Sequence, residues 1–339
     1  MNRKDKPVVI WLLTGCLLIF VMVVIGGITR LTNSGLSMVD WKLIMGMLPP
    51  LSEAEWLSTF KKYQQFPEYQ QVNFMFTLEE FKAIFFWEYL HRMIGRFIGM
   101  VFIIPFFIFL IKKRLSKKVI GQSIILLAMG AFQGFLGWWM VKSGLNKDPD
   151  VSHYRLAIHL ITAFITFAYT FWVALGIIYP GVSSQKLTKP KNLLVVLLVM
   201  VIIQIVYGAF VAGLNAGFVM NTYPKMDDQW MHDSVTAMQP LWLNFIDGIG
   251  GVQFVHRVMA HLIVALIVYL LIISVKFKIA PIQQKSLYVL IVAVFIQFLL
   301  GVFTLLFAVP IALGVIHQVG AFILLGTVVF ALYQFKKSI

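Results

Sequence analysis

Residues 84–111 read IFFWEYLHRMIGRFIGMVFIIPFFIFLI, and Lys112-Lys113-Arg114 follows directly. A transmembrane helix needs about 20 mostly apolar residues, so this stretch predicts a membrane-spanning helix. Because Lys and Arg are retained in cytoplasmic loops, its C-terminal end is expected on the cytoplasmic side. Charged and ionisable residues interrupt the stretch near its other end, and such residues inside a membrane require a partner or a function.

Seven other stretches are also apolar and long enough to cross a bilayer core. They lie near residues 8–28, 119–141, 155–179, 193–213, 250–275, 286–308 and 311–335. Of the 339 residues, 60% are hydrophobic and 12% are charged, whereas soluble domains carry about 25% charged residues. The chain is therefore predicted to be an all-α membrane protein with eight transmembrane helices and both termini in the cytoplasm.

The formal net charge of +14 raises the question of nucleic-acid binding. The basic residues, however, cluster on alternate loops beside the apolar stretches, as expected for cytoplasmic loops. These clusters are Arg3, Lys4 and Lys6; Lys112, Lys113, Arg114, Lys117 and Lys118; Lys186, Lys189 and Lys191; Lys276, Lys278 and Lys285; and Lys336 and Lys337. The charge is thus interpreted as a topology signal, with membrane lipid as a partner and no nucleic acid.

The eight stretches form two sets of four in which the same residues recur in the same order. The matching residues are Asn33-Ser34-Gly35 and Asn215-Ala216-Gly217, Met38 and Met220, His91-Arg92 and His256-Arg257, Gln133 and Gln297, Gly137 and Gly301, and His159 and His317. Such internal repeats are common in membrane proteins. They predict two tandem, pseudo-symmetric four-helix bundles, formed by residues 1–180 and 181–339.

Four of the seven histidines occupy one predicted depth in the membrane. His91, His159, His256 and His317 each lie about six residues into a helix that runs from outside to inside, roughly 9 Å below the outer boundary. Two imidazoles facing each other across a helix bundle can ligate a haem iron, and each half has one such pair. The sequence therefore predicts two haem sites, His91 with His159 and His256 with His317.

Other metals fit this pattern less well, because zinc or copper needs three or four nearby ligands. The only cysteine, Cys16, lies in the first apolar stretch, which excludes an intramolecular disulfide and a cysteine-rich metal site. The remaining histidines, His153, His232 and His261, are expected to be solvated or to form hydrogen bonds.

The halves differ at one acidic position. Glu88 precedes His91 by three residues on the same helix face, and the second half has Gln253 there. A carboxylate beside one site suggests that this site performs proton-coupled chemistry while the other passes electrons. Alternatively, Glu88 forms a buried ion pair with Arg92, four residues further on.

Arginines lie near the outer ends of the histidine-bearing helices. They are Arg92, Arg96, Arg155 and Arg257. Arginine pairs well with carboxylates, so these residues could neutralise haem propionates. Ordinary placement of the charged groups at the membrane interface is the alternative.

Taken together, these residues resemble the haem A synthase family. The resemblance rests on Gly26-Gly27-Ile28-Thr29-Arg30-Leu31-Thr32, Ser34-Gly35-Leu36-Ser37, Pro49-Pro50, Pro67-Glu68-Tyr69, Phe81-Lys82, Trp87-Glu88-Tyr89-Leu90-His91-Arg92, Gly95-Arg96, His159, His256-Arg257 and His317. It covers nearly the whole chain and is strongest to the mitochondrial and proteobacterial branch. Some relatives carry cysteine pairs in the outer loops, which this chain lacks.

The resemblance implies an oxidoreductase that oxidises the C8 methyl group of haem O to a formyl group, giving haem A for terminal oxidases, with water as the oxygen source. It implies that His91 and His159 bracket haem O and that Glu88 takes part in the proton chemistry. His256 and His317 would ligate haem b. It also implies a bacterial inner-membrane location, delivery of haem O by a haem O synthase, and an electron acceptor that the sequence does not identify; homo-oligomerisation is a further expectation.

Two other functions remain compatible with the residues alone. A bis-haem electron carrier of the cytochrome b kind would use the four histidines without requiring Glu88. A transporter with parallel repeats would use the histidines as a proton relay.

Overall fold

The computed structural model describes residues 5–39, 48–145, 149–180 and 188–336. Its eight long helices are α1 (Lys6–Leu31), α4 (Leu78–Ile111), α5 (Lys117–Gly144), α6 (His153–Ile178), α7 (Thr188–Gly213), α8 (Ile249–Ser274), α9 (Pro281–Leu306) and α10 (Ile311–Gln334). All eight are long and apolar enough to span a membrane. The predicted all-α class and the eight spans are confirmed, and the described residues form no β-sheet. Arg3, Lys4, Lys186 and Lys337 lie outside the described residues.

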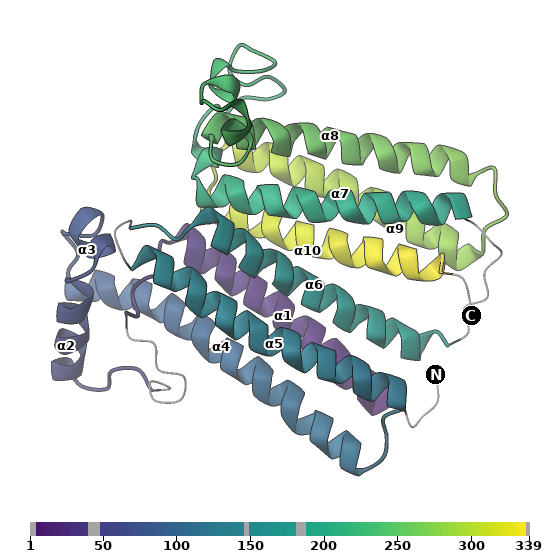
Figure 1. The fold of residues 1–339 in the computed structure, drawn as a ribbon, viewed down its shortest axis with the longest axis horizontal. Helices are drawn as coiled ribbons and strands as arrows, with labels where there is room; N and C mark the ends of the chain where they lie inside the picture. Colours follow the sequence, from purple (N-terminus) through teal and green to yellow (C-terminus); the bar gives the residue numbers. More distant parts are fainter. Residues whose placement is uncertain (1–4, 40–47, 146–148, 181–187, 337–339) are drawn as a thin grey trace.

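In Figure 1 the long helices lie in two groups, α1, α4, α5 and α6 on one side and α7 to α10 on the other, and α6 contacts α7 and α10 across the boundary. The groups lie side by side, and the contacts between them repeat. Helix α10 packs on α1 in the same way that the equivalent helix α6 packs on α7. The start of α1 and the end of α10 lie at the same end of the bundle, as an even number of crossings requires.

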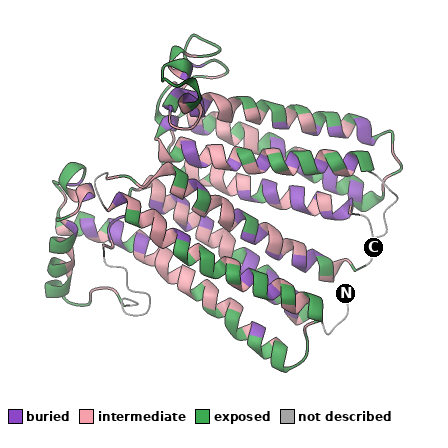
Figure 2. Ribbon diagram, in the orientation of Figure 1, coloured by how far each residue is buried: buried purple, intermediate pink, exposed green. Residues whose placement is uncertain are grey.

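A cluster of aromatic rings joins the two groups. The Phe322 ring of α10 lies with its centroid 5.6 Å from that of Phe20 on α1, and 5.4 Å and 3.9 Å from those of Phe164 and Phe167 on α6. Buried positions concentrate on the helix faces that meet inside the molecule, whereas exposed positions face outward (Figure 2). Cys16 is one of the buried residues, as expected for a small core side chain.

Both long connections between spans lie at the end of the bundle opposite the two termini (Figure 1). The first contains α2 (Glu53–Tyr63) and α3 (Pro67–Gln71), and the second contains three 3₁₀ helices, η1 (Ala216–Phe218), η2 (Asp233–Thr236) and η3 (Leu241–Phe245). Helix α2 begins where the Ser52 side chain accepts a hydrogen bond from the Glu55 amide, a common N-cap arrangement. Helix α2 contacts α4, and the three 3₁₀ helices contact α8.

Helix α4 begins earlier than the hydrophobic pattern predicts. Thr77 and Glu80 form a capping box that starts the helix at Leu78, ahead of the apolar stretch. His91 is consequently not six residues from its helix start, although His159, His256 and His317 are close to that position. The additional turns of α4 carry Phe81, which packs on Tyr63 of α2, while Phe85 at the start of the predicted stretch packs on Trp56.

Candidate functional site

The clearest pair of facing histidines lies in the second half. The rings of His256 on α8 and His317 on α10 have centroids 6.5 Å apart and planes inclined by 78°. Metal–imidazole bonds are about 2 Å long, so one iron fits between a nitrogen of each ring. The Nδ1 atom of His256 is buried and has no hydrogen-bond partner among the described residues. An unsatisfied buried nitrogen is costly, which fits a site completed by a ligand.

His91 on α4 and His159 on α6 form the corresponding pair in the first half. They hold the positions in the repeat that His256 and His317 hold in the second half. The Nδ1 atoms of both are buried and lack a partner among the described residues. In the part of the chain that the structure describes, no group of three or more His, Cys, Asp or Glu side chains is placed to hold a metal ion. Two histidines per site therefore suit an iron whose other ligands come from a porphyrin.

Each of the four histidine rings lies against a glycine of a neighbouring helix. A Cβ atom built on the glycine would lie 3.1 Å from Cε1 of His91 at Gly26, 3.4 Å from that of His159 at Gly137, 3.3 Å from that of His256 at Gly208, and 2.9 Å from that of His317 at Gly301. The glycines are related by the repeat, since Gly26 and Gly208 are offset by the same 182 residues as Asn33 and Asn215. The absence of a side chain thus lets each imidazole approach its neighbouring helix backbone.

Glutamines hold the histidine turns in the second half only. Gln204 on α7 donates to the carbonyl oxygen of His256 at 3.0 Å, and Gln297 on α9 donates to that of His317 at 3.0 Å. In the first half the residue equivalent to Gln204 is Met22, and Gln133 donates to the Thr162 hydroxyl at 2.6 Å. The second histidine pair is therefore fixed by more polar contacts than the first.

Glu88 forms a buried ion pair with Arg92, which is the structural alternative considered from the sequence. Its Oε2 atom also accepts hydrogen bonds from the Ser37 hydroxyl at 2.7 Å and the Met38 amide at 2.8 Å. Arg92 donates in turn to the Met38 carbonyl oxygen at 2.8 Å. The pair therefore anchors the chain that follows α1 to the outer part of α4, one turn from His91.

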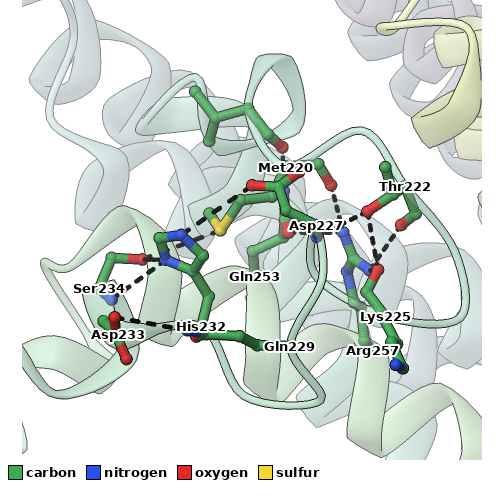
Figure 3. A network of polar contacts seen from close by, with 11 residues as sticks. Met220, Thr222, Lys225, Asp227, Gln229, His232, Asp233, Ser234, Gln253 and Arg257 are labelled. Carbon is green, nitrogen blue, oxygen red and sulfur yellow. Dashed lines mark hydrogen bonds and ion pairs between the residues drawn. The ribbon is translucent and has the colours of Figure 1, made fainter.

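The second half reproduces this anchor with Gln253 in the place of Glu88 (Figure 3). Gln253 donates to the carbonyl oxygens of Ala216 at 2.6 Å and Val219 at 2.8 Å, and it accepts from Arg257 at 2.8 Å. The guanidinium of Arg257 also donates to the carbonyl oxygens of Met220, Thr222 and Lys225 at 2.6 to 3.0 Å. The terminal nitrogens of Arg257 are thus occupied by the outer loop.

The other two arginines lie beside neighbouring side chains of their own region. Arg96 places Nη1 3.6 Å from the sulfur of Met93. Arg155 stacks over the Trp139 ring at 4.4 Å and donates to the Trp139 carbonyl oxygen at 2.7 Å. Neither contact by itself indicates that the arginine binds a haem propionate.

The remaining histidines form the hydrogen bonds expected of them. His153 lies 3.0 Å from the Ile246 carbonyl oxygen, and His232 lies 2.8 Å from the Ser234 hydroxyl. His261 contacts the Tyr223 hydroxyl at 3.0 Å and the Arg257 carbonyl oxygen at 2.7 Å. They stabilise the outer loops and their junctions with α6 and α8.

The roles of several residues of these sites were not identified from the sequence, although Gly26 and Ser37 lie within the motifs of the family resemblance. Gly26, Gly208 and Gln204 contact histidines, and Ser37 donates to Glu88. Extending the 182-residue offset along the first helix would have identified Gly26 and Gly208. Ser37 has no such signal, because its role depends on how the chain turns back after α1.

Residues 9–329 match the model of the family described as COX15-CtaA, cytochrome oxidase assembly protein. The chain is 55% identical over 339 residues to the Heme A synthase of Flavobacterium psychrophilum, covering 99% of this chain and 100% of the relative. It is 53% identical to that of Flavobacterium johnsoniae, with 99% and 100% coverage, and 44% identical to that of Wolbachia pipientis wMel, with 99% and 94% coverage.

Proposed function

Since the chain belongs to the COX15-CtaA family of cytochrome oxidase assembly proteins, we propose that it is a multi-pass membrane oxidoreductase that converts haem O to haem A. One observation supports a division of labour between its halves. Two equivalent histidine pairs share the same glycine contacts, but only the first has a carboxylate, Glu88, on the adjoining turn.

The proposed reaction oxidises the C8 methyl group of haem O to a formyl group with water as the oxygen source. One methyl and one water give one formyl group, four protons and four electrons. The site must therefore release protons and pass electrons to an acceptor. A base near the reacting group and a route for electrons are the two functions that the protein has to provide.

The first half is proposed as the substrate site. His91 and His159 would hold haem O between α4 and α6, and their buried, unpartnered nitrogens support this assignment. Glu88 would accept a proton or orient water, helped by Ser37, whose hydroxyl connects the carboxylate to the turn after α1. Arg92 holds this carboxylate in place through their ion pair. Arg92 and Arg96 lie on the same helix as His91, and their guanidinium groups would contact the propionates of haem O.

The second half is proposed as the site of a resident haem b. The 6.5 Å separation of the His256 and His317 rings fits this group, and Gln204 and Gln297 hold their helix turns in position. Haem b would supply one-electron transfer there. Arg257 would support it indirectly, because it fixes the outer loop above His256.

The proposed location is the bacterial inner membrane, with α2, α3 and the 3₁₀ helices on the outer side and both termini in the cytoplasm. The basic clusters between spans support this orientation. Haem O is proposed to arrive from a haem O synthase, and the electrons leave to an acceptor on the second half. Homo-oligomerisation is compatible with this arrangement and is not required by it.

Co-expression with a haem O synthase in a host without haem A tests the function. Haems extracted from the membranes are separated by chromatography and identified by mass. We expect haem A to appear only when this chain is present. Bound haem b with no conversion of haem O would instead indicate an electron carrier, and the absence of any bound haem would favour a transporter.

A further inference from the structure

A cavity opens in the first half at the outer ends of α4 and α5. It is partly open to the outside, has a volume of about 200 Å³, and is lined by Met38, Val39, Arg92, Trp138, Val141, Lys142 and Leu145. Most of this lining is apolar, and the two charged residues are both cationic. Pockets for whole ligands measure about 300–1,000 Å³, so this cavity has room for one part of a larger ligand.

The charges of the lining are unbalanced. The charge of Arg92 is offset by its ion pair with Glu88. Lys142 lies 5.2 Å from the centroid of the Trp138 ring, and no carboxylate among the described residues forms an ion pair with it. An anion entering the cavity would therefore meet a net positive charge in partly apolar surroundings, where charge-assisted hydrogen bonds are strong.

The cavity lies next to the first histidine pair. Arg92 directly follows His91 on α4. On α5, Lys142 comes five residues after Gly137, which contacts His159, and five residues correspond to about 7.5 Å along a helix. A short carboxylate arm at the edge of a macrocycle held by His91 and His159 would reach outward into this cavity.

The second half has no cationic residue at the position equivalent to Lys142. By the offsets that relate Gly137 to Gly301 and Met38 to Met220, Lys142 corresponds to Leu306 and Val39 to Asn221. Asn221 donates to the Leu305 carbonyl oxygen at 2.9 Å and to that of Gly217 at 2.7 Å. This contact ties the second outer loop to the end of α9.

We infer that Lys142, together with Arg92 and Trp138, forms a binding site for a propionate carboxylate of the substrate haem, and that this site distinguishes the exchangeable haem of the first half from the resident haem of the second. The inference rests on the proposed function, because it assumes that the first half binds haem O. It assigns Lys142 to substrate binding, with no part in the oxidation itself.

The test uses the detergent-purified full-length protein with its resident haem in place. Uptake of one further equivalent is measured by titration with Fe(III) protoporphyrin IX and, separately, with its dimethyl ester, which lacks the negative charges. The wild type is expected to bind the free acid more tightly than the diester. Lys142→Gln should weaken binding of the free acid about tenfold, as expected for one charge-assisted contact, and leave diester binding unchanged.

Two control variants keep the result specific. Lys142→Arg retains the charge and should retain binding of the free acid. Lys225→Gln removes a lysine that also lies over a tryptophan, Trp230, but in the second outer loop, and should change neither titration.

Unchanged binding of the free acid by Lys142→Gln, or equal weakening of acid and diester, would overturn the inference. The inference would also be overturned if phosphatidylglycerol competed with haem binding in the wild type but not in Lys142→Gln, while the acid and the diester bound equally. That result would assign the site to a lipid headgroup. His91→Ala separates this failure from failure of the proposed function. If it abolishes uptake of the further equivalent, the substrate site stands whatever Lys142 does; if the wild type takes up no further haem, both proposals are wrong.

Discussion

Glu88 and Arg92 form a buried ion pair within α4, and the same positions in α8 are held by the hydrogen-bonded pair of Gln253 and Arg257. In each half the arginine donates to the carbonyl oxygen of an equivalent methionine, Met38 or Met220. An amide is therefore sufficient to hold the arginine and the loop. The carboxylate in the first half adds the ability to exchange a proton, which the anchor itself does not need.

Replacing Glu88 with Gln should reduce the yield of haem A at least about 100-fold, because a group in general acid–base catalysis contributes 10²–10⁴-fold. Haem b in the second half should be retained, since Glu88 does not contact α8 or α10 through any hydrogen bond of the described residues. Haem extraction from co-expressing membranes measures both. Glu79→Gln, on the exposed start of the same helix, is the control. A normal haem A yield from Glu88→Gln would show that the Glu88 carboxylate has only a structural role.

Replacing Gly301 with Ala should displace the His317 ring, because the added Cβ would lie 2.9 Å from Cε1. Overpacking of this kind costs about 1–3 kcal/mol, and the strain falls on an iron ligand. The purified variant is expected to contain less haem b per protein. Gly99→Ala is the matched control, since nothing lies within 4 Å of its Cβ; equal haem b contents in the two variants would show that the glycine contact is not needed.

The pH dependence of stability should change when Glu68 is replaced. This residue of α3 is 5% exposed, and burial raises the pKa of its carboxyl to about 8, although the Tyr63 hydroxyl donates to it at 3.0 Å. The unfolded chain releases this proton near the ordinary carboxyl pKa, so the folded state loses relative stability as pH rises from 5 to 8. The loss is at most about 1.4 kcal/mol per pH unit.

Glu68→Gln keeps an acceptor for Tyr63 but cannot ionise, so its stability relative to the wild type should increase from pH 5 to 8. Thermal unfolding midpoints in detergent across this range provide the measurement. Glu53→Gln, at the exposed start of α2, should show the wild-type profile. Parallel profiles for Glu68→Gln and the wild type would mean that Glu68 is already ionised in the folded protein.

The spans, their number and the repeat could be predicted because each depends on local composition and on residues that recur at fixed offsets. The same repeat predicted that His256 and His317 face each other, and their ring centroids lie 6.5 Å apart in the structure. The earlier start of α4 was missed, although Thr77 and Glu80 carry a recognisable capping pattern outside the apolar stretch. The contacts of Ser37 with Glu88 and of Tyr63 with Glu68 could not be predicted, since they join segments whose meeting is set by tertiary packing.

The second half is proposed to hold a resident haem that is separate from the substrate site of the first half. The decisive measurement is the low-spin haem b absorbance of purified His256→Ala, His317→Ala, His91→Ala and His159→Ala variants, with His261→Ala as the control on α8. Loss of an axial nitrogen should remove this signal from the His256 and His317 variants, whereas the His91 and His159 variants should keep it and make no haem A. Retention of the signal in both second-half variants, or its loss from the His91 variant alone, would contradict the assignment of the two halves.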